Sequence, residues 1–105
     1  MGFADFFRQP DIHAGVQEYL RTPGALLLDV RTPAEYRCGH IPGSINVPLQ
    51  HLNSGEEIID NEDTPVFLYC QSGARSRQAA AVLKGLGYSS VRNIGGISAW
   101  HGKVE

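Results

Sequence analysis

The sequence has few of the features that mark nucleic-acid-binding or membrane proteins. Its 105 residues contain 9 Lys or Arg against 11 Asp or Glu, and no segment concentrates the basic residues. Affinity for nucleic acid comes largely from neutralised phosphates, so we expect no nucleic-acid partner. Uninterrupted apolar runs, such as residues 24–28, are far shorter than the roughly 20 residues that cross a bilayer. We therefore expect no membrane partner.

Cysteine is also scarce. The chain has two, Cys38 and Cys70, and they form no C-x-x-C pair. A disulfide scaffold or a structural zinc site would need more cysteines or a different spacing, and the histidines show no metal-ligand spacing. Residues 1–10 lack the charged segment followed by an apolar run that marks a signal peptide. We expect a reduced, cytoplasmic domain with free thiols and no metal.

Length and composition are those of one ordinary globular domain. Residues 1–105 leave no room for a second core, and 42% hydrophobic with 19% charged residues is typical of a folded chain. No internal repeat, linker or low-complexity segment divides it. The near-neutral charge, without an evident exposed apolar stripe, favours a monomer.

Several apolar segments predict strands. Ala25–Val30 is a continuous apolar run with Asp29 near its end, and Pro65–Tyr69 is a second run of the same kind. Such runs are typical of strands buried on both faces of a parallel sheet. Ser90–Ile94 and the shorter Ile45–Val47 are further candidates.

Helices are predicted between these strands. Asp11 is a suitable N-cap, and Thr32 with Pro33 and Glu35 forms a capping box at the start of a second helix. The predicted apolar faces are Ile12, Val16, Tyr19 and Leu20 in the first helix and Ala79, Val82, Leu83 and Leu86 in a helix from Ser76 to a stop at Gly87. Shorter helical turns are predicted at residues 49–53, 56–60 and 96–100. Alternating strands and helices predict an α/β fold, a three-layer α/β/α sandwich around a mostly parallel sheet.

The segment Cys70–Arg77 carries the chemistry. It joins a buried strand to an amphipathic helix, at the carboxyl end of the strand, where open parallel sheets bind ligands. Gly73 permits backbone conformations that let successive N–H groups point inward as an anion-binding nest. A thiol at the base of the nest should have a lowered pKa, and Arg75 adds a positive charge suited to oxyanions. The alternative is that Cys70 is an inert buried thiol, which leaves the polar, glycine-bearing turn unexplained.

Four ordered motifs resemble one family. They are Leu28–Arg31 with Glu35–Tyr36, the segment Gly39–Pro48 (GHIPGSINVP), the loop Cys70–Ser76 (C-x-x-G-x-R-S) and the ending Ile94–Trp100 (IGGISAW). Together they are similar to the rhodanese-like domains, in particular their single-domain members. The resemblance covers residues 12–102, and the motifs follow the family's order.

This resemblance implies a sulfurtransferase without a cofactor. Cys70 would accept a sulfane sulfur as a persulfide, from a small donor anion such as thiosulfate or from a polysulfide or protein persulfide. It would pass that sulfur to cyanide or a thiol acceptor. Arg75 would assist the anionic donor, and the substrate-binding residues would be Gln71, Ser72, Gly73, Ala74 and Ser76, whose backbone N–H groups would surround the outer sulfur.

Two other functions are compatible with this architecture. A cysteine-based phosphatase or arsenate reductase would have five residues between cysteine and arginine, whereas four separate Cys70 from Arg75. A non-catalytic docking or regulatory module often lacks the cysteine. A separate hypothesis makes Cys38 a resolving thiol that attacks the Cys70 persulfide, against the alternative of an incidental exposed thiol.

Three other residues receive structural interpretations. We expect Asp29 to pair with Arg31 or another cation, and His40 to make a hydrogen bond within its turn. Trp100 is expected to fill the core beneath the last turn.

Overall fold

The computed structural model describes residues 10–52, 59 and 61–105, and its sheet is parallel throughout that part of the chain. The strands are β1 (Leu26–Asp29), β2 (Ile45–Asn46), β3 (Val66–Cys70) and β4 (Val91–Gly96). They lie in the order β2-β1-β3-β4, and each neighbouring pair is parallel. Every strand lies within two residues of its predicted range.

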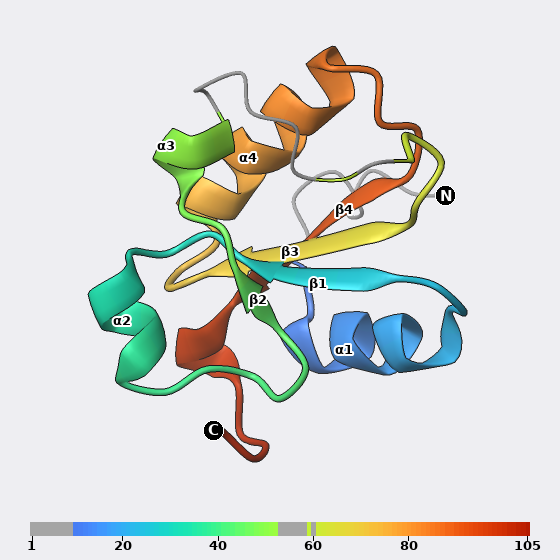
Figure 1. Ribbon diagram of the computed structural model, residues 1–105. Helices are drawn as coiled ribbons and strands as arrows, with labels where there is room; N and C mark the ends of the chain where they lie inside the picture. The colour runs from blue at the N-terminus through green and yellow to red at the C-terminus, as the bar shows by residue number, and fades with distance from the viewer. Residues whose placement is uncertain (1–9, 53–58, 60) are drawn as a thin grey trace, which may run out of the picture.

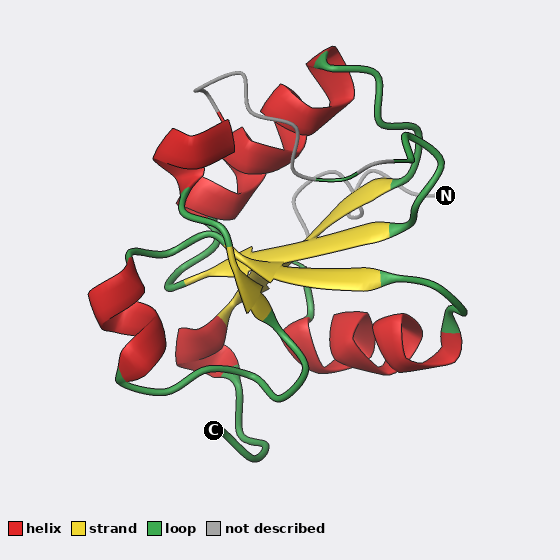
Figure 2. Ribbon diagram, viewed as in Figure 1, coloured by secondary structure: helices red, strands yellow, loops and turns green. Residues whose placement is uncertain are grey.

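Helices cover both faces of the sheet. They are α1 (Ile12–Arg21), α2 (Pro33–Arg37), α3 (Leu49–Leu52) and α4 (Ala74–Gly85), with a 3₁₀ helix, η2 (Ile97–Ala99), near the C-terminus. In Figure 1, α3 and α4 lie on one side of the sheet and α1 on the other. Figure 2 shows the same three layers by type of structure. The predicted α/β/α sandwich is confirmed.

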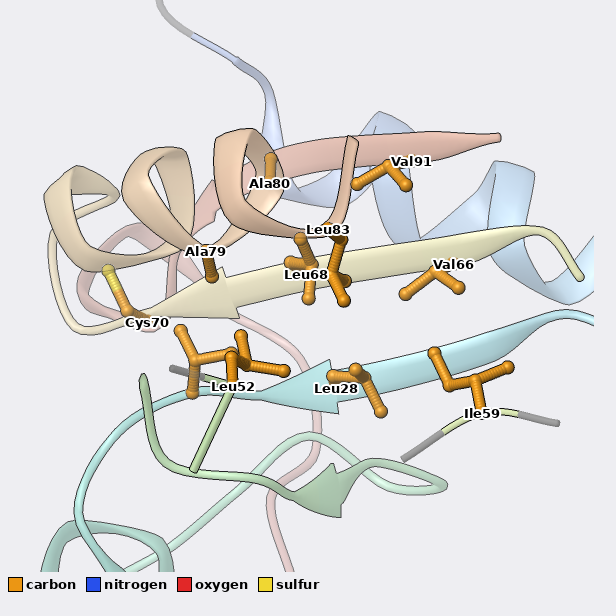
Figure 3. Packing of buried hydrophobic residues seen from close by; sticks show 11 residues of the cluster. Leu28, Leu52, Ile59, Val66, Leu68, Cys70, Ala79, Ala80, Leu83 and Val91 are labelled. Carbon is orange, nitrogen blue, oxygen red and sulfur yellow. The ribbon is translucent and has the colours of Figure 1, made fainter. Parts of the chain in front are cut away.

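Alternation along the strands divides the core in two. In β3, the side chains of Val66, Leu68 and Cys70 face α4, while Phe67 and Tyr69 face α1. Successive side chains of a strand point to opposite faces, so a run buried on both sides fills two cores at once. Figure 3 shows the α4 side, where Cys70 belongs to the apolar cluster.

The predicted helix caps form. The Asp11 carboxylate accepts the N–H groups of His13 and Ala14 at the start of α1. At α2, the Glu35 N–H donates to Thr32 Oγ1 at 3.2 Å, and the Thr32 N–H donates back to Glu35 Oε1 at 3.0 Å. This reciprocal capping box fixes the Glu35 carboxylate beside the carboxyl end of the sheet.

Two predicted helix faces need correction. Leu20 is 67% exposed and Leu86 is 52% exposed, although helical periodicity predicts that both lie on apolar faces. Helix α4 begins two residues before Ser76, and its buried face includes Ser76 and Ala80 in addition to Ala79 and Leu83. Sequence periodicity places Leu86 near that face, but α4 ends at Gly85, so Leu86 leaves the helix as its C-cap and faces solvent.

The aromatic contacts of the C-terminal region follow the prediction only in part. Trp100 packs against the apolar cluster on the α1 side but is only half-buried, and its indole N–H donates to the Lys103 carbonyl. The His13 ring stacks on Trp100 with ring centroids 4.9 Å apart and accepts the His101 N–H. The packing of two distant segments, which local sequence does not encode, explains the difference.

Two further predictions concern a helical turn at residues 56–60 and membrane-spanning segments. The predicted helical turn at 56–60 falls outside the described residues apart from Ile59. Within residues 10–52, 59 and 61–105, no helix is long and apolar enough to cross a membrane.

Candidate active site

The loop after β3 turns sharply into α4. Cys70 is the last residue of β3 and Ala74 the first residue of α4, so three residues, 71–73, form the turn between them. Gly73 occupies the N-cap with φ of +103°, in the left-handed region where a side chain would be strained. In Figure 3 the sulfur of Cys70 lies beside the first turn of α4. The helix N-terminus therefore points its free N–H groups toward the thiol.

The Cys70 thiol is buried and still favours its charged form. Only 1% of the residue is exposed, and that burial by itself raises the pKa. Hydrogen bonds from the Ser76 hydroxyl and from the N–H groups of Ser76, Gly73 and Ser72 outweigh it, so the pKa lies below the ordinary thiol value. The Gly73 N–H donates to Cys70 Sγ at 3.0 Å. The predicted nest is thus formed by the loop backbone around the sulfur.

Ser76 contacts the sulfur of Cys70 through its hydroxyl. Its side chain is fully buried, with Oγ 3.5 Å from Cys70 Sγ and 2.6 Å from Oδ1 of Asn93. A hydroxyl has one proton to donate, so the thiolate and the Asn93 carbonyl compete for it. The sequence predicts Ser76 as a substrate-binding residue. In the structure its hydroxyl contacts the thiol and lowers the pKa of Cys70.

Asn93 is a residue that sequence reasoning missed. It lies in β4 and accepts the Gly95 N–H at 3.0 Å, while its amide group donates to the Gly73 carbonyl at 3.4 Å. These bonds join the loop after β3 to the neighbouring strand. The available signal was an asparagine, which strands disfavour, inside a predicted strand.

Gly96 lets the loop approach β4 closely. A Cβ there would lie 2.4 Å from the Gln71 carbonyl oxygen and 2.7 Å from the Ser72 Cα. Real Cβ atoms do not approach backbone so closely, so the position accepts only glycine in this geometry. The Ser98 N–H then holds the Gln71 carbonyl at 3.1 Å.

A buried ion pair lies beneath the edge of the loop. Arg31 Nη2 lies 2.7 Å from Asp29 Oδ2, and the same nitrogen also donates to the Gly39 carbonyl. The Arg31 guanidinium also reaches Gln71 Oε1 at 3.4 Å. The predicted Asp29–Arg31 pairing is confirmed, and its charges cancel where the strand meets the loop. The expected His40 hydrogen bond is also present, with Nδ1 3.0 Å from the Tyr36 carbonyl oxygen.

Arg75 is engaged by a carboxylate. Its Nη1 and Nη2 lie 2.7 and 2.9 Å from Oε1 and Oε2 of Glu35, a bidentate pair between α4 and α2. The Arg75 guanidinium and the Thr32 N–H lower the pKa of Glu35 to about 2. The sequence places Glu35 in a capping box and in a family motif but does not predict its contact with Arg75, because the two residues are 40 positions apart.

The remaining predicted loop residues lie at the protein surface. Gln71, Ser72 and Ala74 are exposed, and none of their side chains carries charge. Cys38 is an exposed free thiol at the C-cap of α2, whereas Cys70 is a buried free thiol. The described residues bring together no group of three or more His, Cys, Asp or Glu side chains able to hold a metal ion.

Known proteins are similar to this chain in both sequence and fold. The family model described as the Rhodanese-like domain matches residues 13–103. A Bacillus subtilis protein, YqhL, is 43% identical over 82 residues, covering 77% of this chain and 64% of its own length. An Allochromatium vinosum protein named sulfurtransferase is 45% identical over 85 residues, covering 80% of this chain and 78% of its own. The solved structure of a human single-domain sulfurtransferase superposes with a TM-score of 0.73 at 28% identity, covering 83% and 89% of the two chains. The chain thus spans less than two thirds of the length of YqhL.

Proposed function

The chain belongs to the rhodanese-like domain family, and from that membership and the environment of Cys70 we propose that it is a sulfurtransferase with a persulfide intermediate. Cys70 is the nucleophile and sulfur carrier. The N–H groups of the loop and the Ser76 hydroxyl stabilise its charge. Small donor anions, polysulfides and protein persulfides are the candidate donors, and cyanide or a thiol is the acceptor.

The transfer has two balanced steps. The Cys70 thiolate attacks the outer sulfur of thiosulfate, a sulfur–sulfur bond forms at Sγ, and the bond inside thiosulfate breaks with its electron pair leaving on sulfite. Cyanide or an acceptor thiolate then attacks the outer sulfur of the persulfide. Thiocyanate or a new persulfide leaves, and the Cys70 thiolate is restored. Neither step needs an oxidant, a metal or a proton from bulk solvent.

The observation that carries this proposal is the convergence of donors on a buried sulfur. Burial alone would keep Cys70 protonated and inert, yet the hydrogen bonds shift its pKa downward. A persulfide anion has its charge on the outer sulfur, which extends from Sγ toward the same backbone N–H groups. The nest that stabilises the thiolate therefore also stabilises the intermediate.

Intact-mass spectrometry of the reduced protein tests the proposal. Treatment with thiosulfate or inorganic polysulfide should add one sulfur atom, peptide mapping should place it on Cys70, and cyanide should remove it. A protein that gains no sulfur from either donor, although iodoacetamide still alkylates Cys70, would overturn the proposal. In that case phosphatase activity and partner docking become the functions to test.

A further inference from the structure

Two arginines that contact the loop after β3 or lie at its end are paired with carboxylates. Arg75 and Arg77 both lie in the first turn of α4, where Glu35 neutralises Arg75 through two hydrogen bonds and Arg77 is exposed. Arg31, which reaches Gln71 from below, is neutralised by Asp29. The Arg75 and Arg31 guanidinium groups are therefore each offset by a carboxylate, and the side chains of Gln71, Ser72 and Ala74 add no charge.

The Glu35 carboxylate of the Arg75–Glu35 pair is also held by its own helix, α2. Glu35 is fixed by the capping box of α2, where its Oε1 accepts the Thr32 N–H at 3.0 Å while also accepting from Arg75. A bidentate geometry orients the arginine as well. About a third of each side chain is exposed, so the pair lies at the rim of the site, where an incoming donor meets it.

This arrangement distinguishes donors by charge. Thiosulfate brings two negative charges to a thiolate, which favours a site with an uncompensated cation. A persulfide on a thiol, R–S–SH, brings at most one charge at its reacting end. The Coulomb energy scales with the charge of the donor, so neutralising Arg75 penalises a dianion more than a persulfide.

We propose that Glu35 is a specificity-determining residue that neutralises Arg75 and thereby selects a cysteine persulfide of a partner protein over small dianionic donors. This inference rests on the proposed function and specifies its substrate class. In the transfer, the Cys70 thiolate attacks the outer sulfur of R–S–SH. The donor's sulfur–sulfur bond breaks, R–S⁻ leaves, and the proton stays on the sulfur that Cys70 now carries.

Glu35→Gln is the variant that tests this role. Glutamine retains the capping box, since Gln replaces Glu at this helix position, and its amide oxygen still accepts from Arg75. The variant therefore unmasks the arginine charge without removing its support. Glu18→Gln is the matched control, because Glu18 also pairs with an arginine, Arg92, near the opposite end of β4.

The first measurement uses alkylation and does not depend on sulfur transfer. Iodoacetate and iodoacetamide are similar in size, but only iodoacetate is negatively charged. The rate of Cys70 alkylation by iodoacetate divided by the rate with iodoacetamide therefore reports the local charge. Glu35→Gln should raise that ratio about threefold at low ionic strength, and the gain should shrink in high salt. Glu18→Gln should leave the ratio unchanged.

The second measurement uses donors. Glu35→Gln should raise kcat/KM for thiosulfate about tenfold, because the effect on a dianion is about the square of that on a monoanion. The rate with a persulfide of a neutral thiol, 2-hydroxyethyl persulfide, should change less than about twofold. An unchanged alkylation ratio, or equal changes with both donors, would overturn the specificity role.

The two measurements separate this inference from the proposed function. If the wild type takes sulfur from no donor, the proposed function fails while the alkylation ratio still reports on Glu35. If transfer proceeds but the variant matches the wild type, the function stands and the inference fails. The double variant Glu35→Gln with Arg75→Gln, which removes both charges, repeats the alkylation test should the single variant be unstable. A neutral pair predicts the wild-type ratio of the two rates, and a lower ratio would overturn the inference.

Discussion

The hydroxyl oxygen of Ser76 lies 3.5 Å from the sulfur of Cys70, and its shorter contact, 2.6 Å, is with Oδ1 of Asn93. One buried hydroxyl thus connects the thiol at the end of β3 to a polar residue in β4. The thiolate depends on a hydrogen bond that the neighbouring strand also holds. This relationship makes the reactivity of Cys70 sensitive to residues that no donor touches.

Ser76→Ala should make Cys70 less reactive at neutral pH. Removing the side-chain hydrogen bond leaves burial opposed only by backbone N–H groups, so the pKa of Cys70 rises and the thiolate fraction falls. Iodoacetamide alkylation at pH 7 should slow roughly threefold to tenfold, the effect of losing one hydrogen bond of about 1 kcal/mol, as expected for the long 3.5 Å contact. The alkylation-versus-pH profile should shift to higher pH.

Ser98→Ala provides the control for that experiment. Ser98 is exposed and supports the loop through its backbone N–H, which alanine retains. Its alkylation profile should overlie that of the wild type. A Ser76→Ala profile that also overlies the wild type would show that the backbone nest alone sets the pKa of Cys70.

Cys70→Ser should abolish sulfur transfer, and Cys38→Ser should not. Serine fits the buried site and can still accept the Gly73 N–H, so the fold is retained while the hydroxyl is too weak a nucleophile. Thiocyanate formation from thiosulfate and cyanide measures both variants, with thermal unfolding as the check on folding. Near-normal turnover of Cys70→Ser would move the nucleophile elsewhere.

The same pair of variants tests the resolving-thiol hypothesis for Cys38. If Cys38 attacked the Cys70 persulfide, the persulfidated wild type would form an intramolecular disulfide that Cys38→Ser could not form. Cys38 is exposed at the end of α2 and Cys70 is buried at the sheet, so we expect the persulfide to persist equally in both proteins. Non-reducing intact mass distinguishes the two cases.

Arg75→Ala should slow thiosulfate turnover by about tenfold or more, the usual loss for one charged contact. The single variant also leaves Glu35 unpaired at the rim, where its charge repels the donor. The double variant Glu35→Gln with Arg75→Ala should therefore recover part of the lost rate. A double variant as slow as Arg75→Ala alone would mean that the two residues do not act on the donor together.

Much of the loop geometry could be predicted from local sequence. Gly73, the helix that follows it and the position after a buried strand predict a nest of N–H groups, and the structure forms one around Cys70. These features depend on residues a few positions apart. Backbone conformation and helix direction are sufficient to derive them.

The supporting contacts could not be predicted in the same way. Glu35 meets Arg75 across 40 positions, and Ser76 meets Asn93 across 17, through the packing of separate elements. Periodicity reports which face of an element is buried but not which polar group lies opposite. The direction of Arg75 thus follows from the tertiary fold alone.

Asp29→Asn should destabilise the protein more than any surface ion-pair change. It leaves the Arg31 guanidinium buried beside a neutral amide, and breaking one side of a buried pair costs about 3 kcal/mol or more. In urea unfolding the midpoint should fall with an unchanged slope. Glu18→Gln removes an exposed pair, with both side chains at least 45% exposed, and should cost less than about 1 kcal/mol. Equal shifts for the two variants would contradict the structural role of the buried pair.

Gly96→Ala should lower sulfur transfer, whereas Gly85→Ala should raise the stability of the fold and leave transfer unchanged. A Cβ at Gly96 would lie 2.4 Å from the Gln71 carbonyl oxygen, so the loop must move away from β4, and the donors around Cys70 move with it. We expect sulfur transfer to fall at least tenfold, as misplaced catalytic groups typically produce. At Gly85, in α4, a Cβ meets nothing within 4 Å, and alanine should stabilise the helix by about 0.5–1 kcal/mol without changing transfer. Thiocyanate formation and urea unfolding measure both properties, and a Gly96→Ala protein with normal transfer would show that the loop tolerates displacement.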